Sequence, residues 1–234
     1  MKIKILLATY NGEKYIKEQL DSILSQLGYK DEVIISDDGS ADQTLVIVES
    51  YQDSRIKIFK NSFKNLILNF EFALKQAKGD YIFLSDQDDV WLPNKVEISL
   101  AYLIKYDIVV SNCQVVNQNL EVINKSFFQL NNSGQGLISN LIKNSYLGCC
   151  LAFRKEILNK VLPFPKKIPM HDIWLGFVSE LFFKPKFIEE PLMLYRRHGS
   201  NESPTGEDSP FNLYRKFLFR YNIVKNIFIL YFKK

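Results

Sequence analysis

Aspartates gather directly after two apolar segments of this sequence, at a spacing that suggests cation chemistry. The two segments are residues 32–36 and 81–84. The aspartates that follow them are Asp37, Asp38, Asp86, Asp88 and Asp89. If the segments are strands of an open α/β sheet, ligands bind beyond their carboxyl ends, and a divalent cation there would offset the repulsion among the carboxylates. Oxygen ligands favour Mg²⁺ or Mn²⁺, usually held together with substrate phosphates, so the pattern predicts a nucleoside-diphosphate ligand.

Asp86 and Asp88 are two residues apart in an extended segment, so we expect them to project to the same side. One can then meet the metal ion while the other meets a neighbouring group such as a ribose hydroxyl. An isolated Asp-x-Asp is common in surface loops, but this one follows a buried strand and accompanies DDGS (37–40) at a second strand end. DDGS also suits an Asx turn with a helix cap, and we expect both that turn and an Asp37 that faces the ligand.

The elements that position these residues follow from the hydrophobic pattern. Short apolar runs alternate with helical periods through the first hundred residues, which predicts strands joined by crossover helices in a mostly parallel sheet. Strands are expected at 2–8, 32–36, 55–60 and 81–84. Ser40 with Gln43 predicts a capping box, Gly79 a helix C-cap and Pro93 a first helical turn.

The second half is less regular, and its strands no longer alternate strictly with helices. Strands are expected at 108–112, 113–117, 148–153 and 192–197, and helices near 136–143 and 171–183. This arrangement predicts an α/β fold whose sheet becomes mixed in its second half.

The motifs ATYNG (8–12), DDGS and SDQDDVW (85–91) together resemble the nucleotide-sugar half of a family 2 glycosyltransferase with the GT-A fold. The resemblance covers about residues 3–200. It implies nucleotide-sugar binding by Thr9, Tyr10, Asn11, Asp37, Asp38, Asp86 and Arg196. Within that set, Thr9 and Tyr10 would border the base, Asp37 would hydrogen-bond it and Asp86 would lie near the ribose, while Asp88 would bind the metal ion that bridges the phosphates.

The resemblance also places the reaction's base in the segment MHDIW (170–174). Inverting sugar transfer needs a carboxylate opposite the leaving diphosphate, and Asp172 fits that role. The alternative for Asp172 is an acid that only stabilises a helix N-terminus. His171, Gly148, Cys149 and Trp174 are expected to line the acceptor pocket, with Trp174 either stacking on a sugar or packing in the core.

The segment YRRHGSN (195–201) resembles the family's YRxHGxN motif at the edge of the site. His198 would complete the metal coordination begun by Asp88 or meet a phosphate oxygen, and Arg196 would neutralise the diphosphate. The three cysteines are an odd number and form no CxxC motif, which predicts reduced thiols and no zinc site.

The chain's positive charge lies in its tail. Of 30 Lys and Arg residues, six are in residues 211–234, which hold no acid, and the other 24 face 26 acids, so the body is mildly acidic. This distribution disfavours nucleic acid as a partner. The tail's apolar residues recur at helical spacing, which predicts either docking on an anionic membrane surface or packing on the body or a partner subunit. No signal segment or membrane span is expected, and the protein is expected in the cytoplasm, at most peripheral on the membrane.

These observations predict three regions: a nucleotide-sugar-binding half (1–110), an acceptor-binding half (111–205) and a basic aromatic tail (206–234). The function expected is metal-dependent inverting transfer of a sugar from a dTDP- or UDP-sugar to a glycan or lipid-linked acceptor. The segments SDQDDVWLPNK (85–95), MHDIW and YRRHGSN most resemble the rhamnosyltransferase-type enzymes of bacterial surface polysaccharide synthesis, and this resemblance implies rhamnose as the sugar, with a UDP-hexose as the alternative donor. A sugar nucleotidyltransferase should carry a glycine-rich basic loop after the first strand, which ATYNGEKY lacks. A non-catalytic scaffold should lack site carboxylates.

Overall fold

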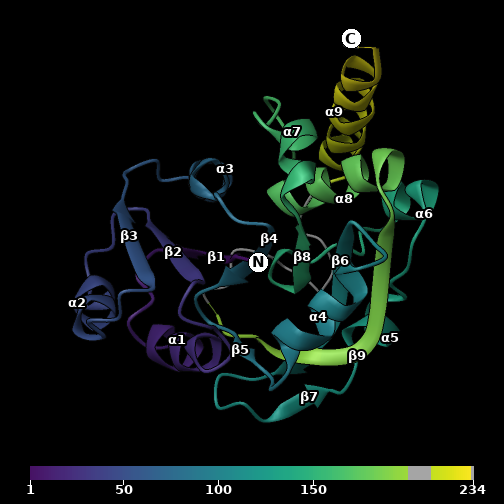
Figure 1. The fold of residues 1–234 in the computed structure, drawn as a ribbon. Coiled ribbons are helices and arrows are strands. Elements are labelled where there is room, and N and C mark those ends of the chain that lie inside the picture. Colours follow the sequence, from purple (N-terminus) through teal and green to yellow (C-terminus); the bar gives the residue numbers. More distant parts are fainter. Residues whose placement is uncertain (200–211, 233–234) are drawn as a thin grey trace.

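The structure is a computed structural model that describes residues 1–199 and 212–232. The described residues form one mixed sheet with helices on both sides (Figure 1), in the strand order β3-β2-β1-β4-β8-β6-β9-β5 with β7 beside β6. The strands are β1 (Ile3–Thr9), β2 (Glu32–Asp37), β3 (Ile56–Lys60), β4 (Tyr81–Asp86), β5 (Val90–Trp91), β6 (Ile108–Val116), β7 (Val122–Asn124), β8 (Leu151–Arg154) and β9 (Pro185–Arg196). The α-helices are α1 (Ile16–Leu24), α2 (Thr44–Ser50), α3 (Leu66–Gln76), α4 (Lys95–Leu103), α5 (Phe127–Asn131), α6 (Leu137–Ile142), α7 (Leu158–Val161), α8 (His171–Phe182) and α9 (Leu213–Phe232), and the 3-10 turns are η1 (Gly148–Cys150) and η2 (Lys155–Ile157).

The parallel strands β1 to β4 bring the predicted acidic segments to one edge. Every residue of β1 is buried, as expected for a parallel strand covered on both faces, and Figure 1 shows α3 and α1 on opposite sides of these strands. The register pairs Thr9 with Asp37 across β1 and β2, and Ala8 with Asp86 across β1 and β4. The expectation that these carboxylates share one sheet edge is therefore confirmed.

The second half makes the sheet mixed, as expected. β8 runs antiparallel between β4 and β6, whereas β6 and β9 are parallel. Figure 1 shows β9 as a long strand that bends toward β5 and α1, and register shifts at Asn112 mark where its pairing with β6 becomes irregular. The fold is the predicted α/β architecture, with a C-terminal helix.

Several strand boundaries in this half were wrong. A strand end was expected at Asn112, but β6 continues to Val116 because the Asn112 amide is satisfied within the fold. Its nitrogen donates to Ser126 Oγ and Glu189 O, and its oxygen accepts from the Phe128 N–H. The last strand begins at Pro185 rather than at 192.

The predicted capping box at Ser40 is also wrong. Helix α2 begins at Thr44. The Ser40 hydroxyl instead donates to Asp37 Oδ2 at 2.5 Å and accepts from the Asn11 N–H at 2.8 Å. Ser40 therefore joins the loops that follow β1 and β2. At the start of α2, the Asp42 side chain accepts from the Thr44 N–H in place of the expected Ser40 cap.

Two further helix boundaries differ from the expectations. Helix α3 ends with Ala77 as its C-cap, and Gly79 is required for a different reason: a Cβ there would lie 3.0 Å from Lys2 O, where the chain passes β1. Pro93 lies outside helix α4, because Asn94 is the N-cap residue, with φ of 68°.

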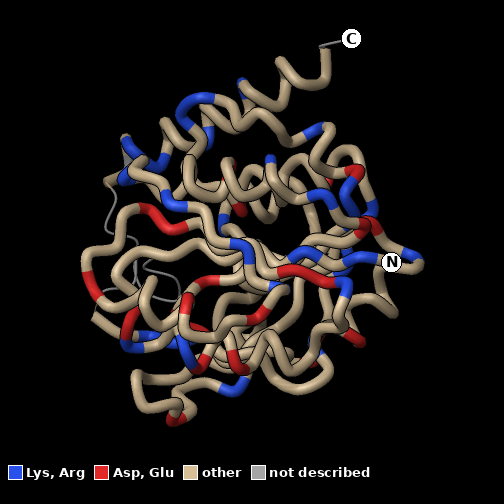
Figure 2. The backbone as a smooth tube through the Cα atoms, turned by 60° about the vertical axis from the view of Figure 1, so that its left-hand side comes forward, with Lys and Arg blue, Asp and Glu red and all other residues tan. Residues whose placement is uncertain are grey.

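Helix α9 packs on α8 through one side, where Ile223 is buried. Its other side leaves apolar side chains between 51% and 70% exposed: Tyr214, Phe217, Tyr221, Val224 and Phe228. Figure 2 shows basic but no acidic positions along this helix. Among the helices the structure describes, none is long and apolar enough to cross a membrane.

Candidate active site

The loop after β2 is held by its own aspartates. Asp37 is 1% exposed, and its carboxylate accepts from the Thr9 hydroxyl and from the Gly39 and Ser40 N–H groups. The predicted Asx turn is therefore present. The carboxylate of Asp38 accepts from the backbone N–H groups of Lys64 and Asn65, before α3. Both carboxylates hold the loop in shape.

The loop after β1 is attached to the DQDD segment through Gln87, which sequence analysis passed over. The Gln87 side-chain amide accepts from the Tyr10 N–H and donates to Tyr10 O, each at 2.9 Å. These are the two backbone hydrogen bonds that a neighbouring strand would otherwise make with Tyr10. A Cβ on Gly12 would overlap the end of the Gln87 side chain, so a larger residue there would displace Gln87 from its hydrogen bonds with Tyr10. Tyr10 itself is 55% exposed, and the Asn11 amide accepts from the Ala41 N–H.

The three carboxylates after β4 differ in environment. Burial, and then the charges of Asp88 and Asp172, raise the pKa of Asp86 to about 8. Burial and the two neighbouring aspartates raise the pKa of Asp89 as well. Asp89 is fully buried; its Oδ1 accepts from the Arg196 N–H, and its Oδ2 has no hydrogen-bond partner among the described residues. Asp88 Oδ2 lies 2.8 Å from His198 Nε2.

The end of β9 fastens the DQDD segment to α1. The Arg196 guanidinium, only 3% exposed, donates to the carbonyls of Asp88 and Gln118 and forms an ion pair with Glu18. The Tyr15 ring lies under that guanidinium and stacks on His198 with ring centroids 4.9 Å apart. These contacts hold the DQDD segment after β4 in place. The sequence did not suggest this structural role for Arg196.

Gln19 is a second residue that sequence analysis missed. It lies on α1 with 0% exposure, and its side-chain nitrogen donates to Ser85 Oγ at 2.6 Å and to Asp86 O at 3.1 Å. A buried amide that satisfies a strand-end carbonyl fixes the position of Asp86. A polar residue on the apolar face of a predicted helix was the only available signal.

Asp172 opens helix α8 and is tied to η1. Its Oδ2 accepts from the Gly148 N–H at 3.1 Å and its Oδ1 from the Ile173 N–H at 2.6 Å. Burial raises the pKa of Asp172 to about 7, and these two hydrogen bonds oppose the rise. The charge of Asp172 contributes to the raised pKa of Asp86, so these carboxyls of the two expected halves lie close enough to interact. The strand expected at 148–153 is η1 followed by β8, and this turn presents the Gly148 N–H.

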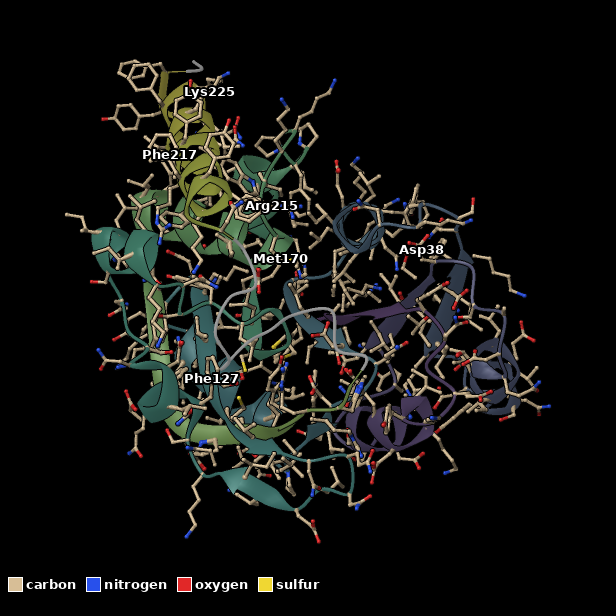
Figure 3. The ribbon with its side chains drawn as sticks, turned by 180° about the vertical axis from the view of Figure 1, so that it is seen from behind. Asp38, Phe127, Met170, Arg215, Phe217 and Lys225 are labelled. Atoms are coloured by element: carbon tan, nitrogen blue, oxygen red, sulfur yellow. The ribbon has the colours of Figure 1, made fainter. Side chains whose placement is uncertain are left out.

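The neighbours of Asp172 are core residues. His171 stacks on Phe70 with centroids 3.9 Å apart, and burial lowers its pKa to about 3. Neither ring nitrogen has a hydrogen-bond partner in the described part of the chain. Trp174 is 1% exposed and donates to Val161 O, so of the two alternatives expected for it the structure shows packing in the core. Figure 3 shows Met170, just before α8, on the side of α8 and α9, and Asp38 on the side of β2 and β3.

The donor set fits a divalent cation. Asp88 and His198 offer oxygen and imidazole ligands, which suit Mn²⁺. A second group of possible ligand atoms lies in neighbouring residues: Asp89 Oδ2 is buried and lacks a partner within residues 1–199 and 212–232, and one ligand atom each from Asp86, Asp89 and Cys149 lies within 4.8 Å of the other two. Such clustering of buried acids is unfavourable without protons or a cation.

Comparison with known proteins shows the family of this chain. The model of the family described as glycosyl transferase family 2 matches residues 4–162, and the chain belongs to that family. The chain is 30% identical over 184 residues to the Escherichia coli protein UDP-Glc:alpha-D-GlcNAc-diphosphoundecaprenol beta-1,3-glucosyltransferase WfgD, covering 76% of this chain and 70% of that protein. It is 30% identical over 219 residues to the dTDP-rhamnosyl transferase RfbG of Shigella flexneri, covering 84% and 73%.

Solved structures agree on the fold. S. aureus TarS 1–349, in complex with UDP-GlcNAc, matches 98% of this chain and 66% of its own with a TM-score of 0.73 at 22% identity. The mannosyltransferase PcManGT of Pyrobaculum calidifontis, in complex with GDP-Man and Mn²⁺, matches 85% of this chain and 58% of its own with a TM-score of 0.65 at 18% identity. The expectations of the GT-A fold and of a family 2 glycosyltransferase are confirmed.

Proposed function

We propose that this chain transfers a sugar, with inversion, from a nucleoside-diphosphate sugar to a glycan or lipid-linked acceptor of a bacterial surface polysaccharide. The observation that carries the proposal is the buried Asp172 carboxyl, whose raised pKa of about 7 suits a general base near neutral pH. Its charge also contributes to the raised pKa of Asp86, the first aspartate of the DQDD segment. We keep residues 1–110 as the donor half and 111–205 as the acceptor half, whose last residues lie outside the described part of the chain.

In this mechanism Asp172 accepts the proton of the acceptor hydroxyl, and the Gly148 N–H holds the carboxylate in position. Thr9 and Tyr10 border the base, Asp37 hydrogen-bonds it and Asp86 lies near the ribose. Asn11 and Asp38 complete the residues that bind the nucleotide sugar. Asp88 and His198, whose side chains lie 2.8 Å apart, would hold the cation. A bound Mn²⁺ or Mg²⁺ ion would neutralise charge on the departing diphosphate. Arg196 acts by holding the Asp88 backbone.

The donor is proposed to be a dTDP- or UDP-sugar. RfbG, a dTDP-rhamnosyl transferase, supports dTDP-rhamnose, and WfgD supports the alternative, UDP-glucose. A thermal-shift screen of dTDP, UDP and their sugar nucleotides, with and without Mn²⁺, tests the assignment. A ligand that binds the native state raises the midpoint of thermal unfolding. Stabilisation by a sugar nucleotide only with Mn²⁺ supports the proposal, and no shift with any of them contradicts it.

We further propose that α9 docks on an anionic membrane surface, where a lipid-linked acceptor would lie. Its exposed apolar side chains include Phe217 and Tyr221, and basic residues near such a surface contribute about 1 kcal/mol each. Figure 3 shows Phe217, Arg215 and Lys225 on this helix. Vesicles of anionic lipid should sediment the wild type at low salt but not Phe217→Ser/Tyr221→Ser. Tyr29→Ser, which removes an 85% exposed ring elsewhere, is the matched control.

A further inference from the structure

Two carboxylates and a thiol form a largely buried cluster. It consists of Asp86 and Asp89, which follow β4, and Cys149 in η1. One ligand atom from each residue lies within 4.8 Å of the other two. Asp89 and Cys149 are fully buried, and Asp86 is only partly buried, so Asp86 is the side from which an ion can enter.

The unpartnered oxygen of Asp89 points to a missing ligand. Its Oδ1 accepts from the Arg196 N–H at 3.0 Å, whereas its Oδ2 is buried without a hydrogen-bond partner among the residues described. A buried carboxylate oxygen in that condition costs free energy unless a donor or a cation meets it. A cation would satisfy that oxygen and offset the repulsion between Asp86 and Asp89.

The presence of sulfur selects the kind of cation. Mg²⁺ and Ca²⁺ prefer oxygen ligands only, whereas Zn²⁺ accepts cysteine sulfur and carboxylate oxygen in one site. Tetrahedral Zn²⁺ with bonds of about 2.0–2.3 Å places its ligand atoms about 3.5 Å apart. Separations no longer than 4.8 Å therefore need only side-chain adjustments of about 1 Å to reach that geometry.

We propose that Asp86, Asp89 and Cys149 form a second cation site, specific for thiophilic divalent ions such as Zn²⁺. It is separate from the Asp88–His198 position and goes beyond the proposed transfer function. An ion there ties the loop after β4, in the donor half, to η1, in the acceptor half. It also draws on the Asp86 carboxylate that the ribose is proposed to use. The cysteine spacing gave no sign of the site because its ligands come from segments about 60 residues apart.

Titration of the reduced, full-length protein with Cd²⁺, a spectroscopic substitute for Zn²⁺, tests the proposal through the ultraviolet cadmium–thiolate charge-transfer band. The wild type should show a band that saturates at one equivalent, and Cys149→Ser should lose it. Cys113→Ser removes another fully buried thiol and should keep the band. The Asp88→Asn variant should also keep it, because Asp88 is not among the ligands. No band in the wild type, or a band that survives Cys149→Ser, overturns the proposal.

A measurement on the wild type covers the case in which the serine variant does not fold. X-ray absorption of the protein with one equivalent of Zn²⁺ should give one sulfur ligand at about 2.3 Å and oxygen ligands at about 2.0–2.2 Å. A spectrum with no sulfur, or with two or more, contradicts the site. Neither readout depends on sugar transfer. An active enzyme that shows neither the cadmium–thiolate band nor the zinc–sulfur ligand refutes this inference alone. An inactive protein that shows both signals refutes only the proposed function.

Discussion

Replacing Asp172 with asparagine separates its chemical role from its structural one. Asn keeps the size of the side chain and removes the basic carboxylate, so sugar transfer should fall by about 10²–10⁴-fold, the usual effect of losing an acid–base group. Donor affinity should persist, because no nucleotide-binding role is assigned to Asp172. In the wild type kcat/KM should rise as pH increases toward about 7, where Asp172 loses its proton, and then level off.

The same substitution has a consequence for stability whose sign follows from the pKa. The folded pKa of Asp172, about 7, lies above the unfolded value near 3.9. The folded state therefore binds more protons between these values, and stability falls as pH rises through that window. Between about pH 5 and pH 8 the wild type should lose about 2–3 kcal/mol relative to Asp172→Asn.

Urea unfolding of both proteins at the two pH values measures this difference, and a donor-consumption assay measures transfer. Glu97→Gln changes an exposed acid in the first turn of α4 and should behave as the wild type in both assays. Sugar transfer by Asp172→Asn at near-normal rates would show that another residue acts as the general base. Equal pH dependence of stability in wild type and Asp172→Asn would show that burial does not raise this pKa.

Three other substitutions test particular contacts. Asp88→Ala should abolish metal-stimulated nucleotide binding in a calorimetric titration with Mn²⁺ while the thermal midpoint stays near the wild-type value, and undiminished stimulation would remove Asp88 from the ion's ligands. Gly12→Ala should destabilise the protein by about 1–3 kcal/mol in chemical denaturation, because the added methyl group overlaps Gln87; no loss would mean that the two strand-end loops separate freely. Trp174→Phe should lower the free energy of unfolding by about 1–3 kcal/mol, because Val161 O loses its hydrogen-bond donor, and it should leave the KM for the acceptor unchanged. A raised KM with an unchanged free energy of unfolding would show that Trp174 belongs to the acceptor site.

The positions of the site's acids were determined by local sequence patterns. Apolar runs of strand length specify buried parallel strands, and parallel strands place their carboxyl ends at one edge, so Asp37 and Asp86 could be assigned to the same edge without coordinates. The Asx turn at Asp37 was predictable because it depends on neighbouring residues alone. The exposed apolar arc of α9 was likewise visible in its helical spacing.

Only the tertiary structure decided which side chains meet across long separations. The contacts of Gln87 with Tyr10, of Gln19 with Asp86 and of Arg196 with Glu18 join residues 67 to 178 positions apart, and no periodic pattern records such pairs. Whether Trp174 faces a sugar or the core also depended on α7, whose Val161 carbonyl accepts its N–H. The raised pKa of Asp172 is decided in the same way, because burial arises from the packing of both halves and not from the residues beside it in the chain.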